Sequence, residues 1–386
     1  MDFTIPEDLK MIQSLARKFV KEELLPIEKQ VEEADDFPDE LRRKLRKKSL
    51  ALGLWNYAAP VEYGGGGLGQ LGRCLIFEEV GRVSQAVGLQ GGVIGECRET
   101  RLLDATEQQK KDYLMPFLQG EKELCTALTE ANAGSDTRAL ETRAVKQGKN
   151  WVINGSKTFI TMADRAAFAM LYAVTRPDSQ SPGITCFLVD KGTPGYNISR
   201  RVHTFGRRGC GVFELSFDNC VVPDDKVLGE VDHGLRIIFS GFAGARLRLG
   251  AHCVGVASRA NEMAMEYART RVTFGKPLAE RQMVQSMLVD NAININATRM
   301  LVYQAAWQAD QGENTRVPAM MVKVFGSEMA TKAVDDAIQI HGGFGYSKDM
   351  VLEMMYRDIR LFRIADGATQ MAKSWIASHL LGIEFS

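Results

Sequence analysis

The sequence predicts a mainly α-helical protein with a central β-rich segment, which is an α+β architecture. Apolar residues recur at helical spacing over the first third of the chain, short β-rich runs follow, and long helical segments return after residue 230. Because the strands are contiguous and do not alternate with helices, this order argues against a doubly wound α/β fold. We expect three domains: a helical one over 1–120, a β-barrel or sandwich over 121–229 and a helical bundle over 230–386.

The first 120 residues predict several helices. One apolar face marks the first helix, formed by Ile5, Leu9, Ile12, Leu15, Phe19 and Val20. A second helix is expected from Asp39 to Leu52, with Pro38 near its start, and another opens at Leu71. Residues 64–69 match the pattern G-x-G-x-x-G, but no apolar strand precedes them, so a loop is favoured over a dinucleotide-binding turn.

The middle of the chain contains five β-rich runs, which we expect to form an antiparallel sheet. Their sequences are ELCTALTE, NWVINGSKTFIT, FAMLYAVTR, GITCFLVD and GVFELSFDNCVV. Turn-forming pairs are expected to separate such runs, at Asn154-Gly155, Ser181-Pro182 and Pro194-Gly195. Beyond them, the helical segments over about 234–270, 279–311 and 317–340 are long enough for a helical bundle.

The composition excludes several classes of protein. The 48 basic and 48 acidic side chains cancel, so nothing attracts the chain as a whole to nucleic acid. The sequence has no apolar run of about eighteen residues, so no membrane span is expected. The start MDFTIPEDLKMIQ resembles neither a signal peptide nor a transit peptide. We therefore expect a cytoplasmic protein, or a mitochondrial-matrix one if this is a processed eukaryotic form. The 7 cysteines and 5 histidines form no C-x-x-C or H-E-x-x-H pattern, so neither a disulfide framework nor a metal site is expected.

Four stretches have compositions that suit a bound ligand, although each also has an ordinary structural explanation. Leu128–Asp136 is a small-residue loop that would expose backbone N–H groups, or simply a turn. Lys157–Thr161 places an aromatic ring and hydroxyls on a strand. Gln339–Tyr346 is rich in glycine after a helix, where a C-cap is the ordinary role, and Ala365–Gln370 opens the last helix, where Asp366 would be an N-cap.

Together these stretches resemble the acyl-CoA dehydrogenase family of FAD enzymes over essentially the whole chain. Residues 127–139, ALTEANAGSDTRA, fit the first motif of that family position by position, and residues 339–358 fit its second motif except at Met354, where a basic residue is usual. The run from Arg271 to Lys276 is similar to the family's R-x-x-F-G element. The resemblance implies an N-terminal helical domain, a central β-domain and a C-terminal four-helix bundle, in agreement with the order predicted above.

The resemblance also implies that FAD binds between the β-domain and the bundle. Thr129 and Thr161 would hydrogen-bond the flavin ring, where donors stabilise the reduced form, and Phe159 would pack against it. Thr369 and Gln370 match positions near the adenylate half. Positions that would contact FAD across a subunit interface are Arg271, Phe274, Gln282, Gln339 and Gly343. A cofactor shared in this way requires at least a dimer, and the family is usually a homotetramer.

The implied reaction is α,β-dehydrogenation of an acyl-CoA thioester, in which a carboxylate removes the α-proton and a hydride passes to flavin N5. The family base is usually Glu in the context Y-E-G-T-x-Q, whereas this chain has Asp366 between Ala365 and Gly367. The other base position known in the family is occupied here by Ala245, so Asp366 is the expected base. Because aspartate is one methylene shorter than glutamate, the substrate, flavin or backbone must shift to keep a productive distance.

Other activities stay open. The same carboxylate would act as an acid if the chain reduced an enoyl-CoA. Nitroalkane oxidase, a relative, uses Asp to deprotonate a nitroalkane, although Lys373 stands here where that enzyme has an arginine. A non-catalytic flavoprotein subunit that kept the fold is a further alternative.

The substrate and its partners leave fewer signals. Segment 88–103 is expected to be the helix that lines the acyl pocket, but its ECRETR run is unusually charged. This predicts either a solvated or interfacial helix face, or a polar acyl tail paired by Arg98 or Glu96. Ser135 and Arg246 match positions near the thioester and the CoA arm, and Ser135 is also expected near FAD. Electron-transferring flavoprotein is the expected electron acceptor.

Overall fold

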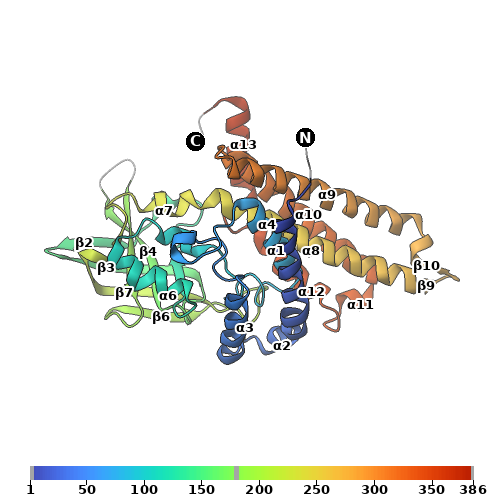
Figure 1. Cartoon of the computed structure of the whole chain (residues 1–386), viewed down its shortest axis with the longest axis horizontal. Helices are drawn as coiled ribbons and strands as arrows, with labels where there is room; N and C mark the ends of the chain where they lie inside the picture. Colours follow the sequence, from blue (N-terminus) through green and yellow to red (C-terminus); the bar gives the residue numbers. More distant parts are fainter. Residues whose placement is uncertain (1–3, 178–181, 384–386) are drawn as a thin grey trace.

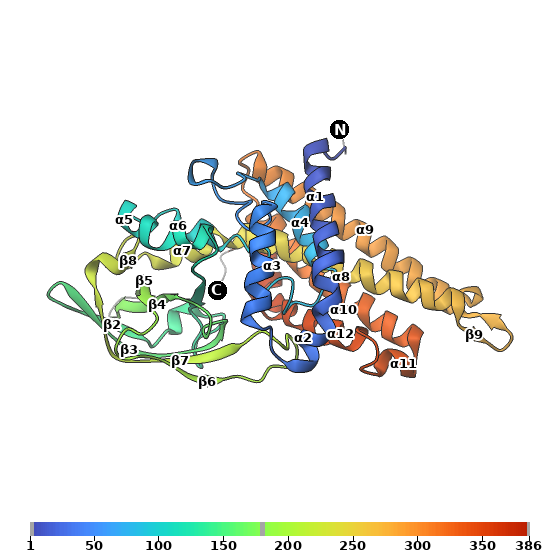
Figure 2. The ribbon, with the colours of Figure 1, turned by 60° about the horizontal axis from the view of Figure 1, so that its bottom comes forward.

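The chain forms a helical part, a β part and a second helical part, in the predicted order. The computed structural model describes residues 4–177 and 182–383, so Ser181 of the expected turn lies outside the described residues. The sheet gathers at one end of an elongated molecule, and the long helices α8 (Phe242–Thr270) and α9 (Gln282–Asp310) reach the other end (Figure 1). The N-terminal helices lie against the middle of these long helices, as the turned view also shows (Figure 2).

The N-terminal helices follow the predicted pattern. Their bounds are α1 Glu7–Phe19, α2 Glu28–Ala34, α3 Asp39–Ala51 and α4 Gln70–Val80. α3 begins directly after Pro38, whose missing N–H costs no helical hydrogen bond at this position. Two acidic residues in the first turn interact favourably with the positive end of the helix dipole. The glycine-rich residues 64–69 form a loop before α4, as expected.

The helix expected over residues 88–103 is wrong. Residues 81–97 form turns and bends, and only a 3-10 helix, η4 (Arg98–Leu102), follows. Glycines explain the difference, because they disfavour a helix and allow the backbone to pass close to other groups. A Cβ atom at Gly95 would lie 1.8 Å from the Trp55 carbonyl oxygen, and at Gly92, where φ is +60°, it would meet the side chains of Arg46 and Glu123.

The β part is one mixed sheet. Strand bounds are β1 Leu124–Ala127, β2 Arg143–Gln147, β3 Asn150–Thr161, β4 Phe168–Arg176, β5 Gly183–Asp190, β6 Tyr196–Arg201, β7 Val212–Pro223 and β8 Val227–Leu228. The main path is β6-β7-β3-β2-β4-β5-β8, with β1 added beside β4. The expectation of a purely antiparallel sheet is wrong, because β1 pairs with β4 in parallel and β2 makes one parallel pair with β4.

Two register shifts in the pairing of β3 with β7 determine which side chains are exposed at the C-terminal end of β3. Asn154-Gly155, expected to be a turn between strands, lies inside β3, where the register against β7 shifts. Gly155 has a φ of +149°, and a Cβ atom there would lie 2.5 Å from Thr142 Oγ1, so only glycine fits this bulge. A second shift between Lys157 and Ile160 gives Phe159 a φ of +55° and turns its ring outward.

Helices cover one face of the sheet and continue into the bundle. α6 (Met115–Leu118) and α7 (Gly234–Ser240) share an apolar core with β4 and β5, and Phe117, Tyr172 and Ile237 belong to that core. The helix expected over 234–270 is interrupted at Gly241, between α7 and α8.

The C-terminal part centres on α10 (Arg316–His341). This helix packs against α8, α9, α12 (Leu352–Arg360) and α13 (Thr369–Leu381). The short strands β9 (Val272–Thr273) and β10 (Lys276–Pro277) form the hairpin between α8 and α9. The helical bundle expected from the long helical segments is therefore present.

All seven cysteines are buried and unpaired, distributed over the three parts of the chain. Within residues 4–177 and 182–383, no helix is both long enough and apolar enough to cross a membrane.

Candidate active site

The end of β3 presents three of the residues assigned to the flavin. Thr129 follows β1 directly, and its carbonyl oxygen accepts a hydrogen bond from the backbone N–H of Thr158 at 2.9 Å, so the two segments lie side by side. Phe159 is 60% exposed, which is unusual for an aromatic ring on a strand and leaves one face free. Thr161 Oγ1 lies 3.3 Å from Nη2 of Arg207, a residue that no sequence signal indicated.

A buried ion pair holds the loop after β1 to β3. Lys157 Nζ donates to Glu130 Oε1 at 2.6 Å and to the Leu128 carbonyl oxygen at 3.0 Å, and Glu130 accepts from the backbone N–H groups of Glu141 and Thr142. Burial lowers the pKa of Lys157 to about 8 although the carboxylate opposes this shift. The pair fixes Thr129 between two anchored residues, Leu128 and Glu130, so the position of the Thr129 hydroxyl depends on it.

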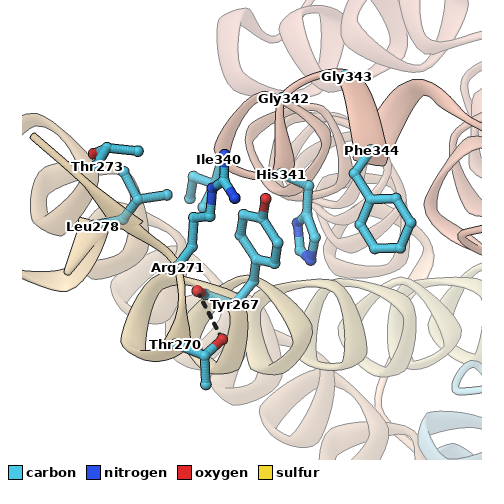
Figure 3. A pocket seen from close by; sticks show the side chains of 10 residues that line it. All are labelled: Tyr267, Thr270, Arg271, Thr273, Leu278, Ile340, His341, Gly342, Gly343 and Phe344. Carbon is cyan, nitrogen blue, oxygen red and sulfur yellow. Dashed lines mark hydrogen bonds between the residues drawn. The ribbon is translucent and has the colours of Figure 1, made fainter.

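A second group of expected residues lines a pocket of about 700 Å³ where α8 meets the end of α10 (Figure 3). Arg271 and Gly343 line it, together with residues that sequence reasoning missed: Tyr267, Thr270, Thr273, Leu278, Ile340, His341, Gly342 and Phe344. The rings of Tyr267 and His341 stack at a centroid distance of 4.3 Å and form its floor. This volume lies in the range that binds small molecules and cofactors.

The remaining cofactor candidates lie outside this pocket. Phe274 at the hairpin tip is 98% exposed, and Gln282, Gln339 and Ser135 are also exposed. At the start of α13, Gln370 is exposed, whereas Thr369 is buried and donates its hydroxyl to the Arg363 carbonyl oxygen at 3.1 Å. One chain therefore brings these residues to three separate places: the end of β3 with the loop after β1, the hairpin end of the long helices and the start of α13.

Asp366 lies on the segment that links helix η9 (Leu361–Arg363) to α13. Its backbone has a φ of +54°, and the N-cap position of α13 is Ala368, which makes no side-chain cap. The ordinary N-cap role for Asp366 is therefore wrong, and its exposed carboxylate is not used to end a helix.

Buried cations hold the backbone of this segment. Arg246 on α8 donates from Nε to the Asp366 carbonyl oxygen at 3.2 Å, and Lys323 on α10 donates to the carbonyl oxygen of Gly367. Burial lowers the pKa of Arg246, and it lowers that of Lys323 to about 8, while the Asp366 carboxylate opposes both shifts. Burial likewise lowers the pKa of Arg101, which also feels the Asp366 charge. Three cations thus feel the Asp366 charge, and two of them hold the backbone of its segment. Sequence reasoning found only Arg246.

The ECRETR segment is folded into the protein interior. Arg98 bonds to Glu96 at 2.8 and 3.1 Å, to Gln90 Oε1 at 2.9 Å and to the Leu124 carbonyl oxygen at 3.0 Å. Its guanidinium is thereby neutralised within the chain. A solvated helix face, one of the two expectations for this segment, is wrong.

Glu99 of the same segment gives a testable pH dependence. Its side chain is 1% exposed, neither carboxylate oxygen has a hydrogen-bond partner among the described residues, and burial raises the pKa to about 7 from 4.5. The folded protein therefore holds this proton at pH values where the unfolded chain has lost it, so stability falls as the pH rises from about 4.5 to 7.

We expect Glu99→Gln to remove this loss. Relative to wild type, the free energy of unfolding of the variant should rise by about 3 kcal/mol between pH 4.5 and 8, since the ionised carboxylate is no longer buried. Urea denaturation of both proteins across this pH range measures the difference. A difference that stays constant with pH would contradict the assignment.

The order of the helical, β and helical segments, together with the matching family models and relatives, defines the acyl-CoA dehydrogenase class of oxidoreductases. The chain belongs to the acyl-CoA dehydrogenase family. Models of the family's N-terminal, middle and C-terminal domains match residues 6–121, 125–220 and 232–381.

Relatives named for different activities align over nearly the whole chain. A 3-(aryl)acrylate reductase of Clostridium sporogenes is 35% identical over 97% of this chain and 99% of its own. Subunit CarC of the caffeyl-CoA reductase-Etf complex of Acetobacterium woodii is 36% identical over 97% of this chain and 98% of its own. The human mitochondrial short-chain specific acyl-CoA dehydrogenase is 35% identical over 98% of this chain and 91% of its own.

Solved structures share the fold closely. Butyryl-CoA dehydrogenase from Megasphaera elsdenii superposes with a TM-score of 0.91 at 30% identity, covering 99% of this chain and 100% of its own. A glutaryl-coenzyme A dehydrogenase solved with glutaryl-CoA gives 0.91 at 31% identity, over 100% of this chain and 98% of its own. PigA in complex with FAD gives 0.93 at 27% identity, over 99% of this chain and 100% of its own.

Proposed function

We propose that this chain is an FAD-dependent acyl-CoA dehydrogenase in which Asp366 removes the α-proton of an acyl-CoA thioester. The observation that carries the proposal is the placement of Asp366: its carboxylate is exposed, caps no helix and lies near Arg101, Arg246 and Lys323. Thr129 and Thr161, which we propose to contact the flavin, lie in the loop after β1 and at the end of β3.

The residues present fit FAD. Arg271 is exposed and makes no ion pair within residues 4–177 and 182–383, so its guanidinium is available to a pyrophosphate. A Cβ atom at Gly342 or Gly343 would meet no heavy atom within 4 Å, which leaves backbone accessible to a ligand in this pocket. Phe159 offers a free ring face. Bound here, FAD would supply the hydride acceptor.

The cations around Asp366 suit the proton transfer. As an oxygen of Asp366 takes the proton, the carboxylate becomes neutral while negative charge grows on the thioester oxygen. The negative charge therefore moves from Asp366 to the thioester oxygen. The positive charges of Arg246 and Lys323 stabilise it both before and after the proton transfer. Arg246 and Lys323 also hold the carbonyl groups of Asp366 and Gly367, so the base is positioned by two side chains from the bundle.

The reverse reaction is a second candidate, because relatives of about 35% identity are named as reductases of acrylate-type substrates. In that direction the protonated Asp366 would donate to the α-carbon of an enoyl-CoA. Anaerobic mixing separates the functions: a panel of acyl-CoA thioesters should bleach the oxidised flavin, and a panel of enoyl-CoA thioesters should reoxidise the reduced flavin. Failure of every thioester in both directions would exclude either function and leave a nitroalkane substrate or a non-catalytic subunit.

We further propose a homotetramer, with each FAD completed by a second copy of the chain. Apolar side chains are exposed along α9 and at the hairpin tip, namely Phe274, Met283, Val289, Ile293, Met300 and Trp307. Electron-transferring flavoprotein is the proposed acceptor, because one relative is a subunit of a complex with it. The proposed compartment is the cytoplasm or the mitochondrial matrix, and the proposed domains are 1–120, 121–229 and 230–386.

Arg271 gives a test of the FAD site that does not depend on turnover. Arg271→Ala should weaken FAD binding by about 10- to 100-fold, since one to two charge-assisted hydrogen bonds to the pyrophosphate are lost. Fluorescence of released flavin during dilution measures the dissociation constant. Arg269→Ala is the matched control, because Arg269 is an exposed arginine in the last turn of α8, two residues before Arg271, and pairs with Glu266. Equal retention of FAD by both variants would contradict the site.

A further inference from the structure

Arg101 is a cation inside the protein that has no acidic partner. It belongs to η4, beside β1 and β4, and its Nη1 donates to Thr126 Oγ1 at 2.8 Å. Among residues 4–177 and 182–383 it forms no ion pair, and its Nε and Nη2 make no hydrogen bond there. Arg98, three residues earlier, has both a carboxylate partner and neutral acceptors. The difference indicates that Arg98 is structural and that Arg101 is available to a ligand.

A second polar group beside Arg101 is also unpartnered. Tyr172 on β4 is completely buried, and its hydroxyl makes no hydrogen bond of normal geometry among the described residues, with only the weakly polar thiol of Cys186, its pairing partner on β5, recorded beside it. Thr126, which accepts the Arg101 hydrogen bond, pairs with Met170 two residues before Tyr172, so Thr126 and Tyr172 face the same side of the sheet. The Asp366 carboxylate opposes the lowering of the Arg101 pKa. A buried hydroxyl without a partner is costly and normally has one, such as a bound ligand.

The charges around the substrate position do not balance. Arg101, Arg246 and Lys323 all feel the carboxylate of Asp366, and Glu328 acts more weakly on Lys323, so three cations face two carboxylates. Arg246 and Lys323 each bind a carbonyl group of the Asp366 segment, whereas Arg101 binds only the hydroxyl of Thr126. An anion brought by the substrate would supply the missing charge, and a carboxylate matches the planar guanidinium best.

We propose that Arg101, with Thr126 and Tyr172, binds a carboxylate on the acyl chain, so that the substrates are carboxyacyl-CoA thioesters. The inference rests on the proposed function, because it places the acyl chain between Asp366 and η4. Arg101 donates from Nε and Nη2 to the carboxylate, and the Tyr172 hydroxyl donates to the same group. A neutral acyl chain of equal length would leave Nε and Nη2 of Arg101 without an anionic partner and the buried Tyr172 hydroxyl without an acceptor.

A pair of thioesters with five acyl carbons tests the inference. Glutaryl-CoA carries the terminal carboxylate and pentanoyl-CoA lacks it. The FAD-loaded wild type should bind glutaryl-CoA about 100-fold more tightly in calorimetry, with a matching preference in kcat/KM for flavin bleaching. Arg101→Met should reduce this preference for glutaryl-CoA over pentanoyl-CoA at least about 10-fold, and Arg101→Lys should restore part of it.

Tyr172→Phe keeps the packing of the ring and should weaken glutaryl-CoA alone. Equal binding of the two thioesters by wild type, or an equal effect of Arg101→Met on both, would overturn the inference. Both results are measured by binding, so they do not require a variant that turns over rapidly. The comparison of the two thioesters uses wild type alone, so it does not depend on whether a variant folds. Bleaching by pentanoyl-CoA without a preference for glutaryl-CoA would refute the carboxylate site and leave the proposed function standing. Absence of bleaching with every thioester, despite selective binding of glutaryl-CoA, would refute the proposed function instead.

Discussion

Asp366→Asn should abolish bleaching of the flavin by acyl-CoA while FAD stays bound. The amide has the same shape as the carboxylate but cannot accept the α-proton, and a general base contributes about 10²- to 10⁴-fold to a rate. We therefore expect kcat to fall within or beyond this range, measured by single-turnover absorbance under anaerobic conditions. The segment itself should persist, since Arg246 and Lys323 bind backbone carbonyl groups that the substitution does not change.

Asp366→Glu is the matched control for this experiment. It keeps the charge and restores the side-chain length usual in the family, so it should bleach the flavin at a rate well above that of the Asn variant. If Asp366→Asn kept most of the wild-type rate, another group would be taking the proton and the proposed role of Asp366 would be wrong. The FAD content of each variant, read from its visible spectrum, shows whether a lost rate reflects a lost cofactor.

Glu130→Gln should lower the free energy of unfolding by about 3–5 kcal/mol, because it leaves the ammonium of Lys157 buried without a counter-charge. Lys157 is 1% exposed and Glu130 is 6% exposed, so water cannot replace the lost carboxylate without opening the structure. Chemical denaturation of the purified holoprotein measures the change. Thr129 shares the loop, so the same variant should also release FAD more readily.

The double variant Glu130→Leu, Lys157→Met separates charge from packing. It removes both buried charges, and we expect it to be considerably more stable than Glu130→Gln, as observed for buried pairs replaced by apolar residues. Glu214→Gln supplies a control on the same sheet, because its pair with Arg200 is solvent-exposed and should add nothing measurable. A Glu130→Gln variant as stable as Glu214→Gln would show that the ion pair does not support the loop.

Periodic apolar residues made the helices predictable. Local conformations that depend on close backbone contacts with distant residues could not be predicted in this way. The α3 boundary follows from Pro38 and the acidic first turn, which act locally. Residues 81–97 avoid a helix because Gly92 and Gly95 pass against side chains and backbone far away in sequence. The pair Asn154-Gly155 has the composition of a turn, but its pairing with β7 makes it a bulge. In both places a distant partner decides the local conformation.

The candidate site was likewise only partly predictable from the sequence. Motif order located Asp366, Arg271, Thr129 and Phe159, although their roles remain predictions. The sequence marked the charged run 96–101 as unusual but could not tell Arg98 from Arg101, since only the fold shows which of them meets Glu96. A lysine on the apolar side of a helix, flanked by Val322 and Val324, is the signal that would have indicated Lys323.

The seven buried thiols give the molecule a set of internal reporters. A thiol-labelling reagent reaches them only when the structure around each sulfur opens, so the labelling rate of each measures the stability of its own surroundings. Cys74 and Cys97 lie in the N-terminal core, Cys125 and Cys220 in the sheet and Cys253 among the bundle helices. Mass spectrometry of timed labelling would therefore show whether the three parts open as one cooperative unit or one after another, and whether a bound flavin couples them.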